Sequence, residues 1–262
     1  MRGILFDLDG VFYVGERAIP GASETLAWVR RSGIPHCFLT NTTSKPRSAL
    51  VDKLARLGLT AGVEEILTPP VAACRWLADR PGTSVALFVP QATEAEFSPL
   101  RVVPRNTAES PGAVIVGDLG EAWDYATLNQ AFRLLMREPQ PHLIALGMTR
   151  YWLSDDGLRL DVAPFITALQ HASGAEPLVL GKPARPFFAA ALQLIGCTAK
   201  AAVMIGDDIR GDVDAAQKAG LGAALLVRSG KYKAADLQSG IHPDAVLDSI
   251  ADLPAWWDAN AA

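Results

Sequence analysis

The sequence predicts an α/β protein, in which a doubly wound parallel sheet is interrupted by an inserted α+β domain. Three observations predict this fold. Short apolar runs alternate with helix-like segments in the first third of the chain, the same alternation returns in the last third, and a separate set of strand and helix signals lies between them. Alternating strands and helices are typical of a parallel sheet covered by helices. The first and last thirds are therefore expected to form one domain that is split in sequence.

The first third contains two apolar runs, which end at Asp7 and at Thr40. Runs of this length and apolar character are typical of parallel strands that are buried on both faces. Helix-like segments follow them, and Gly33 and Gly58 can end those helices. The expected elements, in order, are a strand at 4–6, a helix at 24–31, a strand at 35–39 and a helix within 44–58.

The last third repeats this order, with Gly196 and Gly220 as helix stops. We expect a helix at 183–195, a strand at 201–205, a helix at 212–219 and a strand at 223–227. The middle contains strand candidates at 84–89, 113–116 and 142–146 and a helix candidate at 125–137. Gly and Pro punctuate the chain at 81–82 and at 174–177. The expected domains are a core formed by residues 1–82 and 176–262 and an insert formed by residues 83–175.

Composition excludes several classes of protein. The chain has 262 residues, of which 50% are hydrophobic and 20% charged, so it can bury a large core and is not expected to be disordered. The formal net charge is −4 and the basic residues are scattered, so nucleic acid is not an expected partner. No apolar stretch approaches the roughly 20 residues of a membrane span, and Asp7 and Asp9 interrupt the N-terminal apolar run. No membrane association and a cytoplasmic location are therefore expected.

Polar residues gather at the ends of the expected strands. In a parallel sheet, residues that directly follow the strands converge on one edge, where ligands bind. Here they are Asp7-Leu8-Asp9-Gly10, Thr40-Asn41-Thr42-Thr43, Gly181-Lys182-Pro183 before a helix, and Gly206-Asp207-Asp208 followed by Asp212. This set combines carboxylates, a hydroxyl, an amide and one ammonium group.

Clustered carboxylates repel one another unless a cation neutralises them, so this set implies a bound metal. A hard, all-oxygen ligand set with few carboxylates suits Mg²⁺, which also bridges to phosphate. A carboxylate can act as nucleophile toward a phosphoryl group, and a lysine with hydroxyl and backbone donors suits the oxygens of that group. The residues thus predict phosphoryl transfer through an aspartyl-phosphate, with Mg²⁺ as cofactor. The expected substrate is a small phosphorylated compound, either a phosphomonoester or pyrophosphate.

These four motifs, in this order, resemble the haloacid dehalogenase superfamily over nearly the whole chain. The large insert between the second and third motifs resembles the subfamily with a C2-type cap, which includes the NagD nucleotidase. Within it, residues 40–43, 143–146 and 149–151 are similar to the group of haloacid dehalogenase-like hydrolase domain-containing protein 2 and phospholysine phosphohistidine inorganic pyrophosphate phosphatase. The resemblance implies a Rossmann-like core, a C2-type cap at 83–175 and phosphatase activity.

The resemblance also implies a role for each position. Asp7 is the expected nucleophile and Asp9 the general acid and base, while Lys182 neutralises the nucleophile and the phosphate. Thr40 and the Asn41 backbone are expected to bind phosphate oxygens. The expected metal ligands are Asp7, the Asp9 carbonyl and Asp207, with Asp208 and Asp212 behind them to orient metal waters or Lys182. Asp208 and Asp212 could equally be helix caps.

The substrate is expected to be chosen by the cap. In C2-capped relatives a cap loop determines which substrate is bound, and the stretch with Arg150 and Trp152 is the candidate for this loop. Such relatives often form dimers through their caps, so a homodimer through the insert is a further expectation. Two alternatives stay open from the sequence: a non-catalytic phosphoacceptor or phospho-binding module, and a phosphotransferase or mutase built on the same core.

Overall fold

The computed structural model describes residues 1–154 and 156–260. Contacts divide the chain into two compact units. The first consists of residues 1–40, 47–67 and 182–262, and the second of residues 41–46 and 68–181. The expected insert, 83–175, lies wholly within the second unit, which also contains the flanking segments and the short piece at 41–46.

The first unit is built on a six-stranded parallel sheet in the order β15-β14-β13-β1-β4-β5. β1 and β13 lie at its centre and are buried along their whole length. The strands are β1 (Gly3–Asp7), β4 (His36–Leu39), β5 (Ile66–Leu67), β13 (Ala202–Gly206), β14 (Ala223–Val227) and β15 (Ala245–Leu247), with a small hairpin of β2 (Tyr13–Val14) and β3 (Arg17–Ala18) outside the sheet.

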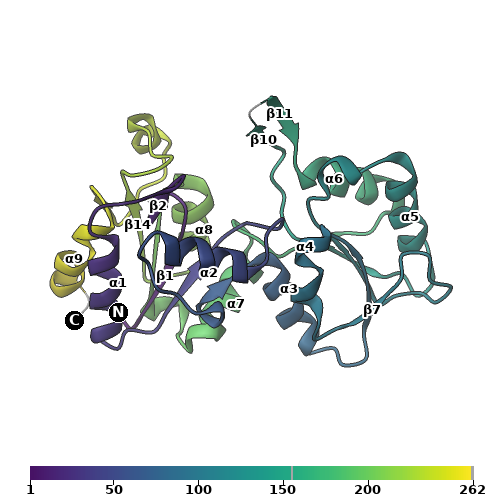
Figure 1. Cartoon of the computed structure of the whole chain (residues 1–262), viewed down its shortest axis with the longest axis horizontal. Helices are drawn as coiled ribbons and strands as arrows, with labels where there is room; N and C mark the ends of the chain where they lie inside the picture. The colour runs from purple at the N-terminus through teal and green to yellow at the C-terminus, as the bar shows by residue number, and fades with distance from the viewer. Residues whose placement is uncertain (155, 261–262) are drawn as a thin grey trace. The chain divides into compact units, whose positions relative to one another are not determined.

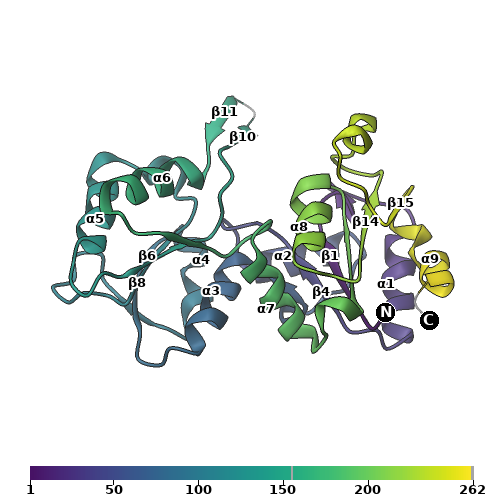
Figure 2. The same cartoon turned by 180° about the vertical axis from the view of Figure 1, so that it is seen from behind.

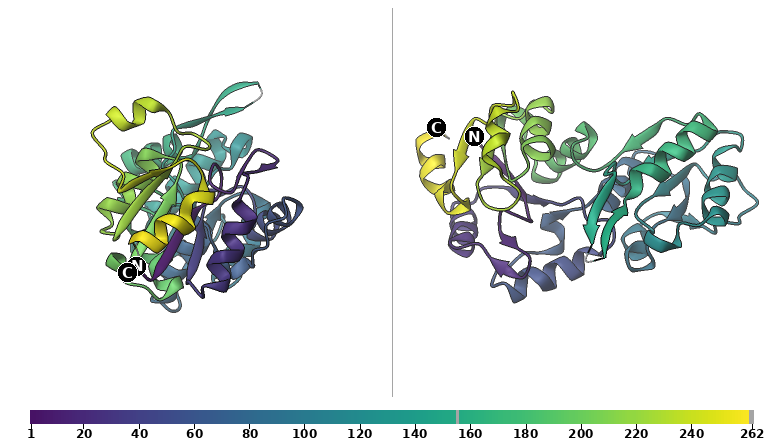
Figure 3. Two further views of the ribbon diagram at one scale, coloured as in Figure 1. Left: turned by 90° about the vertical axis from the view of Figure 1, so that its left-hand side faces the viewer. Right: turned by 90° about the horizontal axis from the view of Figure 1, so that it is seen from above.

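Helices cover both faces of this sheet, as the apolar character of its strands requires. Its helices are α1 (Ala22–Arg31), α2 (Arg47–Arg56), α7 (Arg185–Ile195), α8 (Ala215–Lys218) and α9 (Leu253–Asn260). Figures 1 and 2 show α1 on one face and α7 and α8 on the other. The C-terminal α9 lies beside α1 (Figure 3), where Trp257 packs edge-on against Trp28 with ring centroids 6.3 Å apart. The Trp256-Trp257 pair therefore belongs to the core packing of this unit.

The second unit has its own five-stranded sheet, in the order β12-β9-β8-β6-β7. Its helices α5 and α6 pack against each other over one apolar cluster, and Figure 1 shows α3 on the opposite side of the sheet. Its elements are α3 (Pro69–Ala78), β6 (Ser84–Phe88), α4 (Gln91–Glu94), β7 (Arg101–Val103), β8 (Ala113–Val116), α5 (Tyr125–Leu135), β9 (His142–Ala145), β10 (Tyr151–Ser154), β11 (Gly157–Leu160), α6 (Val162–Ser173) and β12 (Pro177–Val179).

The predicted α/β fold with a parallel, doubly wound sheet is confirmed, and the α+β description of the insert needs one refinement. All neighbours in the five-stranded sheet are parallel. Only the β10–β11 hairpin, which pairs Tyr151 with Leu160, is antiparallel among the strands described in this unit. Of the helices between its strands, α4 and α6 were not expected from the sequence, and parallel strands are recognised by such crossover helices.

Two expected elements differ in detail. The helix expected at 212–219 begins earlier, as a π-helical turn over Ile209–Asp214 that continues into α8. The helix expected within 44–58 begins at Arg47, and the residues before it, 41–46, belong to the second unit. None of the described helices combines the length and the apolar character that crossing a bilayer requires.

Candidate active site

The carboxyl edge of the first unit's sheet collects the polar side chains that follow its central strands. Asp7 is the last residue of β1 and lies opposite Leu39 of β4, so Thr40 continues one residue beyond it. On the other side of β1, Phe6 lies opposite Ile205, which places Asp207 just past the end of β13. Asp7, Thr40 and Asp207 therefore emerge from three neighbouring strands at one edge, as the sequence predicts.

Lys182 joins two of the aspartates. Its Nζ lies 2.6 Å from Asp7 Oδ1 and 2.7 Å from Asp212 Oδ1. All three side chains are buried, with Lys182 8%, Asp7 6% and Asp212 0% exposed. Short, buried, charge-assisted contacts of this kind hold both partners in one geometry. The chain thus brings together residues 175 and 30 positions from Lys182 in sequence.

Burial and charge shift the ionisation of this group. Burial raises the pKa of Asp7, although the attraction of Lys182 opposes the shift. Burial, opposed by Lys182 and reinforced by the charge of Asp7, raises the pKa of Asp212 to about 6. Burial alone would lower the pKa of Lys182, but the two carboxylates outweigh it and raise the pKa, so this lysine stays charged. One ammonium group facing two carboxylates leaves the cluster with an excess of negative charge.

Asp207 has a buried carboxylate oxygen that suits a cation. Its Oδ2 accepts a hydrogen bond of 2.7 Å from the backbone N–H of Lys231, whereas its buried Oδ1 has no partner among the described residues. Burial raises the pKa of Asp207 as well. Asp7, Asp207 and Asp212 each offer a carboxylate oxygen, and these atoms lie within 4.8 Å of one another. A buried, unpaired carboxylate oxygen in an acidic cluster suits a hard metal ion, so the residues fit a metal site.

Gly10 allows the loop after β1 to approach this cluster. Its φ of 82° is in the left-handed region, and a Cβ built on it would collide with the Asp207 carboxylate. Ser229 Oγ donates a hydrogen bond of 2.6 Å to its carbonyl. The same loop carries Asp9, whose side chain is exposed beside the buried Asp7. An exposed carboxylate at this position is free to exchange protons with a ligand or with water.

Asp208 and Asp212 have different contacts, although both were expected behind the metal ligands. Asp208 Oδ1 accepts hydrogen bonds from the backbone N–H groups of Arg210 and Gly211, at 3.0 and 2.9 Å, so it caps the π-helical turn. Asp212 contacts Lys182 directly and accepts a hydrogen bond of 3.1 Å from the Asp208 backbone. Asp212 is therefore placed to orient Lys182, whereas Asp208 caps the π-helical turn and pairs with Lys231, whose Nζ lies 3.7 Å from Asp208 Oδ2.

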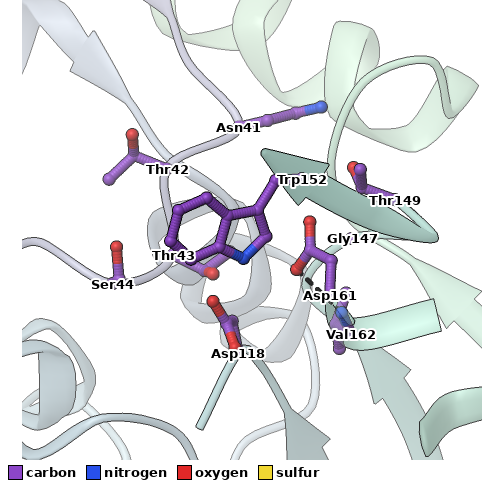
Figure 4. Close-up of a pocket in the computed structure, with 10 residues that line it drawn as sticks. All are labelled: Asn41, Thr42, Thr43, Ser44, Asp118, Gly147, Thr149, Trp152, Asp161 and Val162. Carbon is purple, nitrogen blue, oxygen red and sulfur yellow. Dashed lines mark hydrogen bonds between the residues drawn. The ribbon is translucent and has the colours of Figure 1, made fainter. Parts of the chain in front are cut away.

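The second unit holds the other expected substrate-binding residues. A pocket of about 240 Å³ is lined by Asn41, Thr42, Thr43, Ser44, Asp118, Gly147, Thr149, Trp152, Asp161 and Val162 (Figure 4). Asn41 and Trp152 thus line one pocket. Arg150 does not: it is exposed, and its guanidinium lies 5.7 Å from the centre of the neighbouring Tyr151 ring.

Sequence reasoning missed several residues of both sites. Asp118 lies two residues past the end of β8, near the carboxyl edge of a parallel sheet, but no motif surrounds it in the sequence. Asp161 caps α6, a helix that was not expected, and the backbone of Lys231 reaches Asp207 from a loop with no motif of its own.

The sequence relatives decide the family. A sequence profile described as haloacid dehalogenase-like hydrolase matches residues 4–100, and a second, described as HAD-hydrolase-like, matches residues 179–253. The phospholysine phosphohistidine inorganic pyrophosphate phosphatase of Homo sapiens is 40% identical over 256 residues, which cover 96% of this chain and 91% of that protein. The chain belongs to the haloacid dehalogenase-like hydrolases. The predicted family and the predicted phosphatase class are thereby confirmed.

A second sequence relative and a solved structure are similar to this haloacid dehalogenase-like phosphatase over most of its length. Haloacid dehalogenase-like hydrolase domain-containing protein 2 of Mus musculus is 38% identical over 247 residues, which cover 94% of this chain and 91% of that protein. The crystal structure of a glycerol phosphate phosphatase from Mycobacterium tuberculosis in complex with magnesium superposes with a TM-score of 0.81 at 27% identity, covering 95% of this chain and 76% of that one. The similarity therefore extends over both units.

Proposed function

We propose that this phosphatase is a Mg²⁺-dependent phosphohydrolase that forms an aspartyl-phosphate on Asp7. The observation that supports this most strongly is the buried contact of Lys182 with both Asp7 and Asp212, at 2.6 and 2.7 Å. A cation held at a nucleophilic carboxylate is placed to attract the phosphoryl group and to stabilise the charge that develops on it. A purely structural ion pair would not require Asp7 to stand at the strand edge, where the polar ends of three strands meet.

In the first step, a carboxylate oxygen of Asp7 attacks phosphorus. The new bond joins Asp7 to the phosphoryl group, and the bond between phosphorus and the leaving-group oxygen breaks. Asp9, exposed two residues further along, donates its proton to that oxygen. Lys182 stays charged throughout and offers an N–H donor to a phosphoryl oxygen, with Asp212 holding it in place.

In the second step, Asp9 accepts a proton from water, and the water oxygen attacks phosphorus. The bond between phosphorus and Asp7 breaks, which releases inorganic phosphate and restores the carboxylate. Thr40, which follows the neighbouring strand, would donate a hydrogen bond to a phosphoryl oxygen. Asp9 thus changes from acid to base between the two steps, and Asp7 is the group that carries the phosphate.

The metal is proposed from the chemistry of the donor set. Asp7 and Asp207 would hold it, with the Asp9 backbone carbonyl as a third ligand, and the unpaired Oδ1 of Asp207 would face it. Bound Mg²⁺ supplies positive charge that neutralises the carboxylates and the phosphoryl oxygens. The magnesium complex of the glycerol phosphate phosphatase supports this choice of ion.

The substrate is proposed to be a small phosphorylated compound, with the second unit acting as a C2-type cap that chooses it. The relatives' names include phospholysine, phosphohistidine, pyrophosphate and glycerol phosphate. Dimerisation through this unit stays a prediction. A phosphotransferase or mutase would use the same residues but would pass the phosphoryl group from Asp7 to an acceptor other than water.

A phosphatase screen tests this proposal. The purified chain is assayed for phosphate release from an aryl phosphate, sugar phosphates, nucleotides, phosphoglycolate, pyrophosphate and phosphoamino acids, with Mg²⁺ and with excess EDTA. We expect hydrolysis that requires Mg²⁺ and is lost in the Asp7→Asn variant. Turnover that persists in EDTA, or in Asp7→Asn, would contradict the proposed mechanism.

A further inference from the structure

The pocket of the second unit has a lining suited to one kind of ligand. It combines hydroxyl groups from the 42–44 segment, two carboxylates and the face of one indole ring. Figure 4 shows the Trp152 ring lying across the pocket, with Thr43 and Asp118 beneath it and Asp161 to one side. The lining segment directly continues the chain from Thr40, a residue that we propose to bind phosphate.

Thr43 has an unsatisfied hydroxyl inside this pocket. The residue is only 8% exposed, and its hydroxyl makes no hydrogen bond with the described residues. A hydroxyl that has no protein partner in a largely buried residue is satisfied by whatever fills the space beside it, a ligand or water. Because Thr43 lines the pocket, its hydroxyl is available to a polar ligand there.

The two carboxylates still have free acceptor positions. Asp118 Oδ1 accepts a hydrogen bond of 2.8 Å from the Gly120 N–H, and its Oδ2 accepts none from the described residues. Asp161 Oδ1 accepts one of 2.7 Å from the Val162 N–H, as the cap of α6. A carboxylate has about four acceptor positions, so both can accept more. Burial raises the pKa of Asp161, and the charge of Asp118 adds to this, although hydrogen bonds with the Val162 N–H and the Thr149 side chain oppose the shift.

No cation of the pocket balances these charges. Among the described lining residues there is no lysine, arginine or histidine. Arg159 lines a neighbouring pocket that shares Trp152, but Asp156 and Glu121 already hold it, at 2.6 and 3.4 Å. The pocket is therefore acidic as well as polar.

We propose that this pocket binds a cationic group, an ammonium or guanidinium, on the leaving group of the substrate. The Asp118 and Asp161 carboxylates would accept its N–H donors, the Thr43 hydroxyl would accept another, and the Trp152 face would attract its charge. This inference rests on the proposed phosphatase function and specifies the substrate class: small phosphorylated amines or guanidines. It also implies that pyrophosphate, whose leaving group is an anion, is a poor substrate for this chain.

Three two-carbon phosphate esters test the inference, because they differ mainly in the charge at the far end. O-phosphoethanolamine carries an ammonium group, 2-hydroxyethyl phosphate a hydroxyl group and phosphoglycolate a carboxylate. We expect kcat/KM of the wild-type chain to fall in that order. In Asp118→Asn, which keeps the size of the side chain and an oxygen for the Gly120 N–H, kcat/KM for the amine should fall about tenfold relative to the hydroxyl compound. In the same variant, kcat/KM for phosphoglycolate should rise relative to that for 2-hydroxyethyl phosphate.

Asp124→Asn is the matched control. It removes the same charge from the same unit, at the cap of α5, where asparagine caps as well as aspartate does. It should leave the ratio between the three substrates unchanged. Thermal unfolding of each variant checks that the fold is retained, and Asp161→Asn provides a second variant with the same expected loss of preference for the amine.

The outcomes separate this inference from the proposed function. Turnover of an aryl phosphate with no preference for the amine, or with the same ratios in Asp118→Asn as in the wild type, overturns the cation pocket and leaves the phosphatase proposal standing. Failure to hydrolyse the aryl phosphate as well would overturn both.

Discussion

Replacing Lys182 by methionine removes the positive charge that contacts Asp7 and Asp212, and its effects on activity and on stability can both be estimated from the structure. The ammonium lies 2.6 and 2.7 Å from the two carboxylates, and all three groups are buried. A charge aimed at the reacting group typically contributes ~3 kcal/mol or more to the stabilisation of the transition state. We therefore expect kcat to fall at least about a hundredfold.

The same substitution should lower stability in a way that depends on pH. Leaving a buried charge without its partner costs about 3–5 kcal/mol, unless the group takes up a proton. The pKa of Asp212 is already raised to about 6 with Lys182 present, and removing the lysine raises it further. An acid whose pKa is raised by folding binds more protons when folded, so its contribution to stability falls as pH rises. The loss of unfolding free energy should thus be larger at pH 8 than at pH 6.

Urea denaturation in EDTA at the two pH values, together with steady-state kinetics in Mg²⁺, measures both effects. Lys233→Met is the control, because Lys233 is exposed in the same unit and its side chain lies outside the cluster. Retention of more than a tenth of wild-type kcat, in a Lys182→Met variant that remains folded, would refute the assigned role. A stability loss that is equal at the two pH values would refute the electrostatic reasoning.

Three further variants test other parts of the structure. Gly10→Ala should weaken Mg²⁺ activation and lower the unfolding free energy by about 1–3 kcal/mol, because the new Cβ would collide with Asp207 and the residue has a positive φ. A Mg²⁺ titration of activity measures the first effect, and a denaturation curve measures the second. Trp152→Ala should change relative kcat/KM across substrates more than Arg150→Ala does, because Trp152 lines the pocket and Arg150 does not. Equal changes would count against a role of that pocket in substrate choice. Trp257→Ala should lower the melting temperature by several degrees with KM unchanged, as measured by calorimetry and kinetics.

Much of the first unit could be predicted because its signals are local. The apolar run that ends at Asp7 forms β1, and the run that precedes Thr40 forms β4. The strand expected at 223–227 has those bounds in the structure. The convergence of Asp7 and Asp207 follows from the parallel order of their strands. The contact of Lys182 with Asp212 could be anticipated only through the family resemblance, because nothing in the local sequence specifies a pairing over 30 positions.

The second unit was less predictable, for physical reasons. Its strands are short, and α3 and α6 were missed although their ends carry local signals: Pro69 and Pro70 open α3, and Asp161 and Gly174 cap the two ends of α6. The pocket depends on packing between segments far apart in sequence, from Thr43 to Asp118 and Asp161, and no spacing rule links such positions. The piece at 41–46 shows the same limit, since its contacts, rather than its sequence, place it with the second unit.

The central claim is that Asp7 carries the phosphoryl group and Asp9 moves the proton, and intact-protein mass after rapid quench tests it most directly. With an aryl phosphate, whose leaving group scarcely needs protonation, Asp9→Asn should accumulate a phosphate adduct, because the base that activates water is lost. General acid–base assistance is typically worth about 10²–10⁴-fold, so the stall should be visible in a single turnover. Asp7→Asn should form neither adduct nor product. An adduct in Asp7→Asn and none in Asp9→Asn would contradict the mechanism.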